Sequence, residues 1–303
     1  KNGVDVVQTV QDDGRYNHHA KGFENEHIYK VDDKIAEKLK EFSKLLFKGT
    51  LRHSYPHSWR SKAPLIYRNT PQWFISMEKN KLRDIALKSI DETVFYPPQG
   101  QTRLRSMIET RPDWCVSRQR VWGVPLPLFV SKETGQPLRD LEVVERIADI
   151  YEEEGSDTWF TEDPQRFLGE KYNLEDYDQV KDVVEVWFDS GSTHAFCLEK
   201  REDLKWPASM YLEGSDQHRG WFHSSLLESA GTRGRAPYES VLTHGFVVDG
   251  KGRKMSKSVG NVISPDDILK KYGVDILRLW VVASDYYDDL KLDNNILQSQ
   301  TDS

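Results

Sequence analysis

Two lysines separated by small hydroxyl residues are the part of this sequence that points most directly to chemistry. The run reads Lys254-Met255-Ser256-Lys257-Ser258. Glycines in the preceding residues 249–252 keep such a loop mobile, and the ammonium groups, hydroxyls and backbone N–H groups can together surround a polyphosphate. A solvated basic loop is the plainer interpretation of two lysines spaced three apart. The complete pentapeptide, placed between an apolar segment and a helix start, favours phosphate binding, although it is not a Walker A loop.

A second polar segment lies where an apolar strand is expected to end. The residues after Leu212 read Glu213-Gly214-Ser215-Asp216-Gln217-His218-Arg219-Gly220. Open parallel sheets bind their ligands at the carboxyl ends of the strands. The Glu213 carboxylate can accept hydrogen bonds from ribose hydroxyls, and Asp216 and Gln217 can hold an ammonium group and a carbonyl. A capped polar turn needs fewer polar side chains than this segment contains, so we favour a binding role.

Arginines and tryptophans alternate in residues 111–125, and a further tryptophan, Trp187, closes an expected strand. Alternating arginines and aromatics suit contact with RNA phosphates and terminal bases. They equally suit domain packing through arginine–aromatic stacking, and the sequence leaves both interpretations open. Trp187 can line a small apolar pocket or belong to the core, and these alternatives also stay open.

The expected elements place these segments at one edge of a parallel sheet. Three apolar runs predict strands, over residues 183–188, 210–212 and 241–248. Because a helix is expected between the last two strands, they form a βαβ unit. Ser264 followed by Pro265 is a typical helix start. The expected helices span residues 32–46, 81–90, 141–153, 221–230, 265–272 and 275–283. The acidic stretch 131–182 is interpreted as an inserted surface module.

The composition excludes several classes of protein. The chain has 303 residues, a net charge of −7 and a mean hydropathy of −0.69, with no apolar run near the roughly 20 residues of a membrane span. Only two cysteines occur, which excludes a disulfide framework and an all-cysteine zinc site. This cysteine content and the absence of a secretory signal predict a cytoplasmic protein. The acidic balance argues against a nucleic-acid coat protein, although a local basic patch can still bind RNA.

The motifs together resemble one enzyme family. The pentapeptide at 254–258 is similar to the signature loop of class I aminoacyl-tRNA synthetases. Residues 213–222, 113–125 and 187–192 resemble the isoleucyl-tRNA synthetase family within that class. Residues 55–60 and 70–74 look like that family's return from its editing insertion. The similarity extends from about His53 to the end of the chain.

The resemblance implies an α/β fold, the second half of a class I synthetase Rossmann-like parallel sheet. Residues 1–75 would be the end of the editing insertion and the return to the catalytic domain. Residues 76–248 would be the second half of the catalytic domain, interrupted by the acidic module at about 131–182. Residues 249–303 would hold the signature loop and the start of a helical stem.

The resemblance also implies a function, ATP-dependent activation of isoleucine to isoleucyl-adenylate and transfer to tRNA(Ile). Lys254 and Lys257 would be catalytic, within a pentapeptide (Lys254, Met255, Ser256, Lys257, Ser258) that binds ATP. The adenylate would contact Glu213, Gly214, Asp216 and Gln217, and Trp187 and Trp221 would line the amino-acid pocket. Magnesium would accompany ATP and needs no protein cage. The implied partners are isoleucine, ATP and tRNA(Ile), with no membrane, for a protein that acts as a monomer.

The sequence also departs from the family pattern. The histidine pair His18-His19 does not form the H-I-G-H-type motif that such enzymes place before the signature loop. We therefore expect an internal part of a larger enzyme that is inactive alone. Ser58 and Ser61 stand where some members carry a zinc-binding cysteine pair, so no zinc is predicted here. The alternatives are a non-catalytic fragment that binds tRNA or nucleotide, and the hydrolytic portion of an editing domain.

Overall fold

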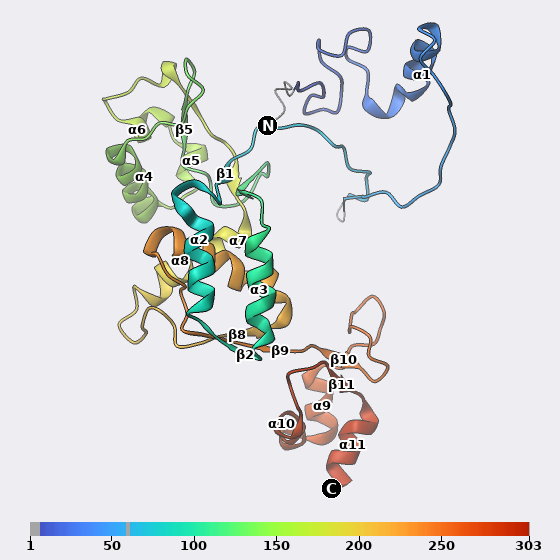
Figure 1. The fold of residues 1–303 in the computed structure, drawn as a ribbon, viewed down its shortest axis with the longest axis vertical. Coiled ribbons are helices and arrows are strands. Elements are labelled where there is room, and N and C mark those ends of the chain that lie inside the picture. The colour runs from blue at the N-terminus through green and yellow to red at the C-terminus, as the bar shows by residue number, and fades with distance from the viewer. Residues whose placement is uncertain (1–6, 59–60, 303) are drawn as a thin grey trace. The chain divides into compact units, whose positions relative to one another are not determined.

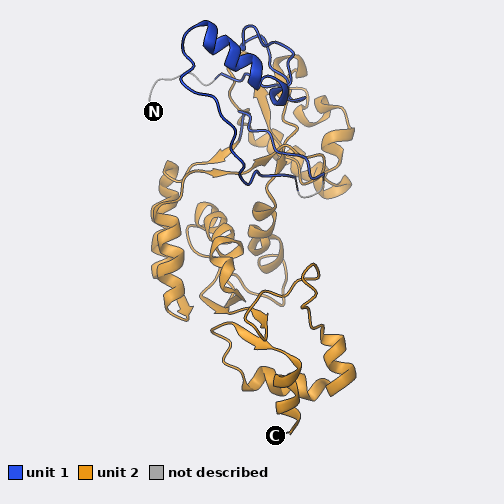
Figure 2. Ribbon diagram, turned by 90° about the vertical axis from the view of Figure 1, so that its right-hand side faces the viewer, with its two compact units in different colours: residues 1–72 blue, residues 73–303 orange. Residues whose placement is uncertain are grey.

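The computed structural model describes residues 7–58 and 61–302, and the chain divides into two compact units, residues 1–72 and 73–303 (Figure 1, Figure 2). The first unit contains a short 3-10 helix, η1 (Ile28–Lys30), and one α-helix, α1 (Asp32–Glu41). Val31 is its only buried apolar side chain among the described residues. The described part of this unit therefore lacks a hydrophobic core of its own.

Helix α1 is shorter than the predicted helix over residues 32–46. It ends at Glu41 because Ser43 adopts a positive φ of 54°, which a helix interior does not allow. Leu46, the last residue of the predicted helix, is fully exposed. Residues 55–58 contain only an isolated bridge between His57 and Pro64, and Trp59 and Arg60 lie outside the described residues.

A three-stranded parallel sheet forms the centre of the second unit. Its strands, in spatial order, are β2 (Val94–Tyr96), β9 (Ser240–His244) and β8 (Tyr211–Gly214). Strands β8 and β9 are joined through α8 (Trp221–Arg233), so the predicted βαβ unit is confirmed. Helix α8 is buried on nearly all sides, from Phe222 to Ala230, which fits its position at the centre of the main core.

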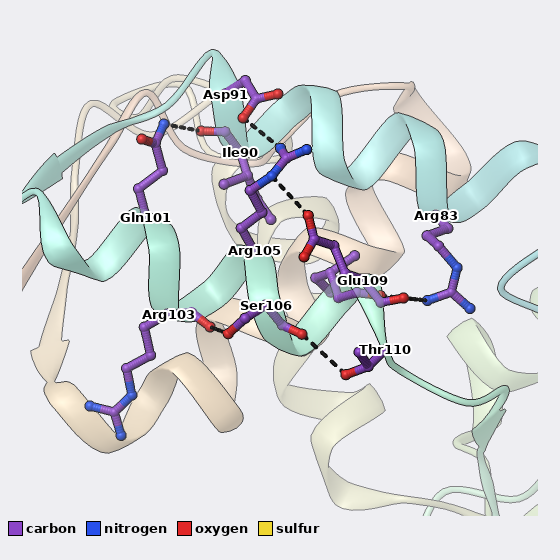
Figure 3. A network of polar contacts seen from close by, with 10 residues as sticks. Arg83, Ile90, Asp91, Gln101, Arg103, Arg105, Ser106, Glu109 and Thr110 are labelled. Atoms are coloured by element: carbon purple, nitrogen blue, oxygen red, sulfur yellow. Dashed lines mark hydrogen bonds and ion pairs between the residues drawn. The ribbon is translucent and has the colours of Figure 1, made fainter.

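Two helices, α2 (Leu82–Asp91) and α3 (Gln99–Glu109), complete this core. They are neighbours and run in opposite directions (Figure 1). The sequence predicts α2, as the helix over residues 81–90, but not α3, because consecutive prolines at 97 and 98 are typical of a break between elements. Pro98 instead precedes the first turn of α3, where its missing N–H costs nothing. One ion pair joins the two helices, from Arg105 on α3 to Asp91 on α2, and Arg105 also pairs with Glu109 on its own helix (Figure 3).

The predicted strand over residues 183–188 is wrong beyond its first two residues. Strand β7 (Val183–Val184) pairs with β4 (Ser117–Arg118), and the chain then turns into α7 (Val186–Gly191). Helix α7 packs closely on α8, because a Cβ atom at Gly191 would lie only 2.1 Å from Glu228 Oε1. The apolar Val-Val-x-Val-Trp-Phe run thus serves a short strand and a packed helix, which its pattern alone does not distinguish. A π-helix, η4 (His194–Leu198), follows.

The acidic stretch forms a small substructure with its own core. Its elements are β5 (Phe129–Ser131), α4 (Leu141–Glu154), α5 (Thr158–Thr161), α6 (Pro164–Leu168), η3 (Leu174–Asp176) and β6 (Tyr177–Gln179). Strands β5 and β6 pair in antiparallel fashion. Trp159 is fully buried against Phe129 and Phe167, and its indole N–H donates to the Val180 carbonyl. Asp140 caps α4, as its side chain accepts from the Glu142 N–H.

The C-terminal region contains a third core. Its helices are α9 (Pro265–Tyr272), α10 (Val274–Ala283) and α11 (Asn294–Asp302), and its strands are β10 (Val247–Asp249) and β11 (Leu290–Leu292). The Ser264 side chain caps α9 as predicted. The single strand predicted over 241–248 is two strands, β9 and β10, separated at Gly245, where a Cβ atom would lie 2.3 Å from the Asp288 carbonyl.

The remaining elements are short. They are β1 (Phe74–Ile75), η2 (Lys79–Lys81), β3 (Trp114–Cys115) and η5 (Ser215–Arg219), with β1 and β3 paired in antiparallel fashion. Within residues 7–58 and 61–302, no helix combines the length and apolar character needed to cross a membrane.

Candidate functional site

The carboxyl end of β8 carries the polar residues that the sequence singled out. Glu213 and Gly214 end the strand, and Asp216 and Gln217 lie in η5, immediately before α8. Glu213 and Asp216 are exposed. A Cβ atom at Gly214 would lie 2.8 Å from Asp216 Oδ1, so a side chain there would displace the Asp216 carboxylate. The structure thus brings these four residues together at a strand end, where parallel sheets bind ligands.

Gln217 also has a structural role. Its Oε1 atom accepts a hydrogen bond from the Trp221 N–H at 2.8 Å, so it caps the first turn of α8. Its Nε2 atom lies 3.4 Å from Asp216 Oδ2. The side-chain amide is therefore held in place before any ligand arrives, and only part of its hydrogen-bonding capacity is free for one.

The two predicted pocket tryptophans come from α7 and α8. The Trp221 ring stacks on Tyr211, with centroids 4.0 Å apart and planes 5° from parallel, and its indole N–H donates to the Ser190 carbonyl at 2.9 Å. Trp187 is 40% exposed and lies against Gly220, where a Cβ atom would approach the ring to 3.0 Å. Trp221 is thus anchored on both sides, whereas the exposure of Trp187 does not fit the core interpretation.

The signature loop is fixed at its base by Asp249 and Asn261. Asp249 accepts hydrogen bonds from the N–H groups of Lys251 (3.0 Å) and Arg253 (2.8 Å) and from the Asn261 side chain (2.9 Å). Asn261 in turn accepts from the Ser256 N–H at 2.9 Å and donates to the Lys254 carbonyl at 3.2 Å. These donors, with Asn261 first, lower the pKa of Asp249 well below its usual value.

The side chains of the loop point mostly to solvent. Lys254, Lys257 and Ser258 are exposed, while Met255 packs against the C-terminal core. Neither lysine forms an ion pair with any residue that the structure describes. The loop therefore combines a fixed backbone with two cationic groups available to an anionic ligand. Sequence reasoning missed Asp249 and Asn261, although Asp-Gly before the pentapeptide and Gly-Asn after it are turn signals.

The arginine–tryptophan segment divides into a packed half and an exposed half. Trp114 is buried, and its indole N–H donates to Glu185 Oε2 at 2.7 Å. Arg118 donates to the carbonyls of Cys115 and Ser117. By contrast, Trp122 is 86% exposed in a bend of the chain. The packing interpretation holds for the first half, and the exposed ring suits a stacking contact.

Metal ligands do not gather in the described part of the chain. No group of three or more His, Cys, Asp or Glu side chains there could hold a metal ion. Ser58 and Ser61 form a local turn, in which the Ser61 N–H donates to Ser58 Oγ at 3.2 Å.

A family profile described as tRNA synthetases class I (I, L, M and V) matches residues 8–293. The chain belongs to this family. The resemblance seen in the motifs extends over its whole length, since it is 68% identical over 303 residues to the isoleucine–tRNA ligase of Pelagibacter ubique, covering 100% of this chain and 34% of that protein. It is 56% identical over 322 residues to the isoleucine–tRNA ligase of Brucella abortus biovar 1, covering 99% and 33% respectively.

This class I chain therefore spans about a third of the length of the curated relatives it matches. Among solved structures, it is similar to Mycobacterium tuberculosis methionyl-tRNA synthetase in complex with methionyl-adenylate. The TM-score is 0.53 at 18% identity, covering 84% of this chain and 42% of the other. This similarity confirms the expected α/β fold with parallel strands.

Proposed function

We propose that this chain is part of an isoleucine–tRNA ligase, which activates isoleucine with ATP to isoleucyl-adenylate and transfers it to tRNA(Ile). The observation that carries the proposal is the arrangement at the end of β8, where Glu213 and Asp216 adjoin Gln217 and the side chain of Gln217 accepts from the Trp221 N–H. The 68% identity to an isoleucine–tRNA ligase supports isoleucine as the amino acid.

Activation joins the isoleucine carboxylate to the α-phosphorus of ATP and releases pyrophosphate. Lys254 and Lys257 would stabilise the negative charge that grows on the departing pyrophosphate, with Met255, Ser256 and Ser258 completing the loop that holds ATP. Stabilising charge that develops in the transition state is what such cationic groups contribute. Magnesium would bind through the ATP phosphates, and the exposed loop fits that arrangement because it needs no protein ligand cage.

The end of β8 would hold the product of this step. The Glu213 carboxylate is exposed and accepts no hydrogen bond from another described residue, so it can accept hydrogen bonds from ribose hydroxyls. Gly214, Asp216 and Gln217 would complete the adenylate contacts. Trp187 and Trp221 would form the wall of the isoleucine side-chain pocket, with Trp221 held rigidly by Tyr211.

The domain assignment and the RNA contact are part of the same proposal. Residues 1–75 are the end of an editing insertion and the return to the catalytic domain, 76–248 the second catalytic half with the module at about 131–182, and 249–303 the signature-loop region and the start of the stem. The exposed Trp122 would stack on a base of tRNA(Ile). We infer a monomer of the cytoplasm, where two cysteines in 303 residues suit a reducing compartment.

Isoleucine-dependent exchange of pyrophosphate into ATP tests the proposal in a full-length protein that carries this chain. Exchange that requires isoleucine supports the proposal. Exchange that requires a different amino acid, exchange that needs no amino acid, or the absence of exchange contradicts it. Deacylation of mischarged tRNA(Ile) separately tests the editing assignment.

A further inference from the structure

Two adjoining cavities lie between the arginine–tryptophan segment and the start of α8. The first, of about 340 Å³, is lined by residues 111–115 together with Arg118, Glu185 and Trp187. The second, of about 440 Å³, reaches the end of α3 at Thr110. The cavities share four lining residues, which are Arg111, Pro112, Arg219 and His223. None of the proposed ATP-binding residues of the signature loop lines either cavity.

Some side chains common to both cavities carry polar atoms that form no ordinary hydrogen bond with the described residues. His223 is 4% exposed, and neither of its ring nitrogens makes a hydrogen bond of normal geometry in the described part of the chain, although the His218 backbone interacts with the ring. Arg111 Nε is likewise buried and unpartnered there. The Arg111 guanidinium lies 5.5 Å from the Trp114 ring centroid, and no described carboxylate pairs with it. Buried polar groups in native proteins normally form hydrogen bonds. These atoms are therefore candidates to bind a ligand.

The charges around the cavities favour an anion. Arg111, Arg118 and Arg219 bring three positive charges against the two carboxylates of Asp113 and Glu185, so the lining of the first cavity keeps an excess of one positive charge. Arg118 is the arginine that the carboxylates offset, since Glu185 accepts from the Trp114 indole and lies 3.6 Å from Arg118. Asp113 keeps its charge but is held in place by the Met77 N–H, from which it accepts at 2.8 Å. The N-cap of α8, Gly220, also lines the first cavity, so the positive end of the helix dipole adds to the same field.

His223 contributes as a neutral ring. Burial, followed by the nearby Arg111 charge, lowers the pKa of His223 to about 3. At neutral pH the ring therefore offers one N–H donor and one acceptor without adding a fourth charge. A buried donor that lines the same cavities as the arginines suits a tetrahedral oxyanion, to which guanidinium groups donate in pairs.

We propose that Arg111, Arg219 and His223, with Arg118 beside them, form a phosphate-binding site separate from the signature loop. The phosphate can come from the backbone of the tRNA substrate or from a free polyphosphate, and the two sources share the same recognition chemistry. The choice of tRNA as a source rests on the proposed function, whereas the phosphate site itself rests only on the cavity.

The site is first tested with inorganic phosphate in a full-length protein that carries this chain. A ligand that binds only the folded state raises the unfolding temperature, so phosphate should raise it above the value in chloride at equal ionic strength. Arg111→Met removes the unpaired charge while keeping the length of the side chain, and it should abolish the phosphate effect while leaving the chloride value equal or higher. An equal phosphate effect in wild type and Arg111→Met overturns the proposal.

The source of the phosphate is tested with Arg219→Gln, since Arg219 is exposed and its loss should not disturb the core. The control is Arg201→Gln, which removes an equal charge from an exposed arginine outside both cavities. If the ligand is RNA, Arg219→Gln should weaken tRNA(Ile) binding about tenfold and reduce the salt dependence by roughly one phosphate contact. If the ligand is a free polyphosphate, the KM for ATP rises instead.

Equal effects of Arg219→Gln and Arg201→Gln on both measurements overturn the site. The phosphate effect on the unfolding temperature of wild type and Arg111→Met does not depend on which amino acid the protein activates, so it tests the site even if the proposed function fails. Failure of the proposed function would appear separately, as the absence of isoleucine-dependent exchange in wild type.

Discussion

Lys257 extends into solvent from a loop whose backbone is held by Asp249 and Asn261. A cation on a fixed base can meet charge that develops on a leaving group without a large reorganisation. We predict that Lys257→Ala slows isoleucine-dependent pyrophosphate exchange by about 10²–10³ while leaving the KM for isoleucine nearly unchanged. Lys251→Ala, an exposed lysine whose backbone N–H alone contacts Asp249, is the matched control. An exchange rate within a fewfold of wild type for Lys257→Ala contradicts the role.

Glu213 lies at the end of a buried strand but is itself exposed. Its replacement by Ala removes no contact that the described structure makes, so the unfolding temperature should stay within about 2 °C of wild type, as expected for a surface substitution. Affinity for a non-hydrolysable isoleucyl-adenylate analogue should fall at least tenfold, the loss of one hydrogen-bonded charged group. Unchanged affinity for the analogue, or a large loss of stability with intact binding, would show a structural residue instead.

Replacing Trp221 or Trp187 by Ala should change the unfolding free energy by different amounts but should change the amino-acid preference in the same way. Trp221→Ala removes a ring stacked on Tyr211 and should cost about 3 kcal/mol of unfolding free energy, whereas Trp187→Ala, at 40% exposure, should cost much less. An apolar wall excludes larger side chains by overlap, but a smaller side chain leaves only a void. Both variants should therefore admit leucine or methionine and flatten the preference for isoleucine over valine, measured as kcat/KM for each amino acid. Unchanged selectivity in both variants places the pocket elsewhere.

At the scale of single elements, the connection between β10 and α9 depends on one amide side chain. Asn261 joins Asp249, Lys254 and Ser256, so it links the strand end to both halves of the pentapeptide. We predict that Asn261→Ala lowers kcat for exchange at least tenfold and raises the KM for ATP more than the KM for isoleucine, because only the loop loses its fixed geometry. Limited proteolysis should cut the variant faster between residues 250 and 260. Equal changes in both KM values would argue against a positioning role.

Helix α8 carries a buried acid that makes its packing depend on pH. Burial, and then the nearby Asp189 charge, raises the pKa of Glu228 to about 9 from an ordinary value of 4.5. The folded state then keeps a proton that the unfolded state releases, so this group's contribution to stability is lost as pH rises from about 4.5 to 9. His223, with its pKa lowered to about 3, acts in the opposite direction but only below its ordinary pKa of 6.5.

Between pH 7 and 9, therefore, the Glu228 effect should stand alone on this helix. Unfolding free energy should fall by up to about 1.4 kcal/mol per pH unit in wild type. Glu228→Gln should remove most of this slope and be the more stable protein at pH 9. Glu202→Gln, at an exposed glutamate, should leave the slope as it is. Denaturant unfolding at several pH values checks this, and a Glu228→Gln slope equal to that of wild type contradicts it.

The sequence predicted some elements well and others poorly, for physical reasons. The βαβ unit around α8 and the start of α9 were predictable because strand, helix and cap signals are local. Helix α3 was missed because Pro98 breaks a helix in most contexts but begins one here. Residues 183–188 were predicted as one strand because a short apolar run fits a strand and a packed helix equally.

The candidate site shows the same division. Glu213, Asp216 and Gln217 are adjacent in sequence, so their position at a strand end could be predicted. The partnership of Asn261 with Asp249, and the cavity that joins Arg111 to His223, depend on residues far apart in the chain. No local pattern marks such contacts, and only the fold brings them together.

At the scale of the molecule, the second unit contains three separate clusters of buried apolar residues. One surrounds α8, one surrounds Trp159 in residues 129–177, and one surrounds Trp280 in the C-terminal region. The proposed site residues belong to the first and third regions, and none lies in the second. Proteins with several cores need not unfold in one step, so stability can change in one region without changing in the others.

We therefore expect a core substitution in the acidic module to act locally. Trp159 is fully buried against Phe129 and Phe167 and bonded to the Val180 carbonyl, so Trp159→Ala should cost the module about 3–5 kcal/mol. Hydrogen exchange resolved by peptide should then show lost protection in residues 129–180. Residues 211–243, which contain β8, α8 and β9, should keep theirs. If both regions lose protection equally, the two cores unfold as one, and the module is a structural part of the sheet that carries the site.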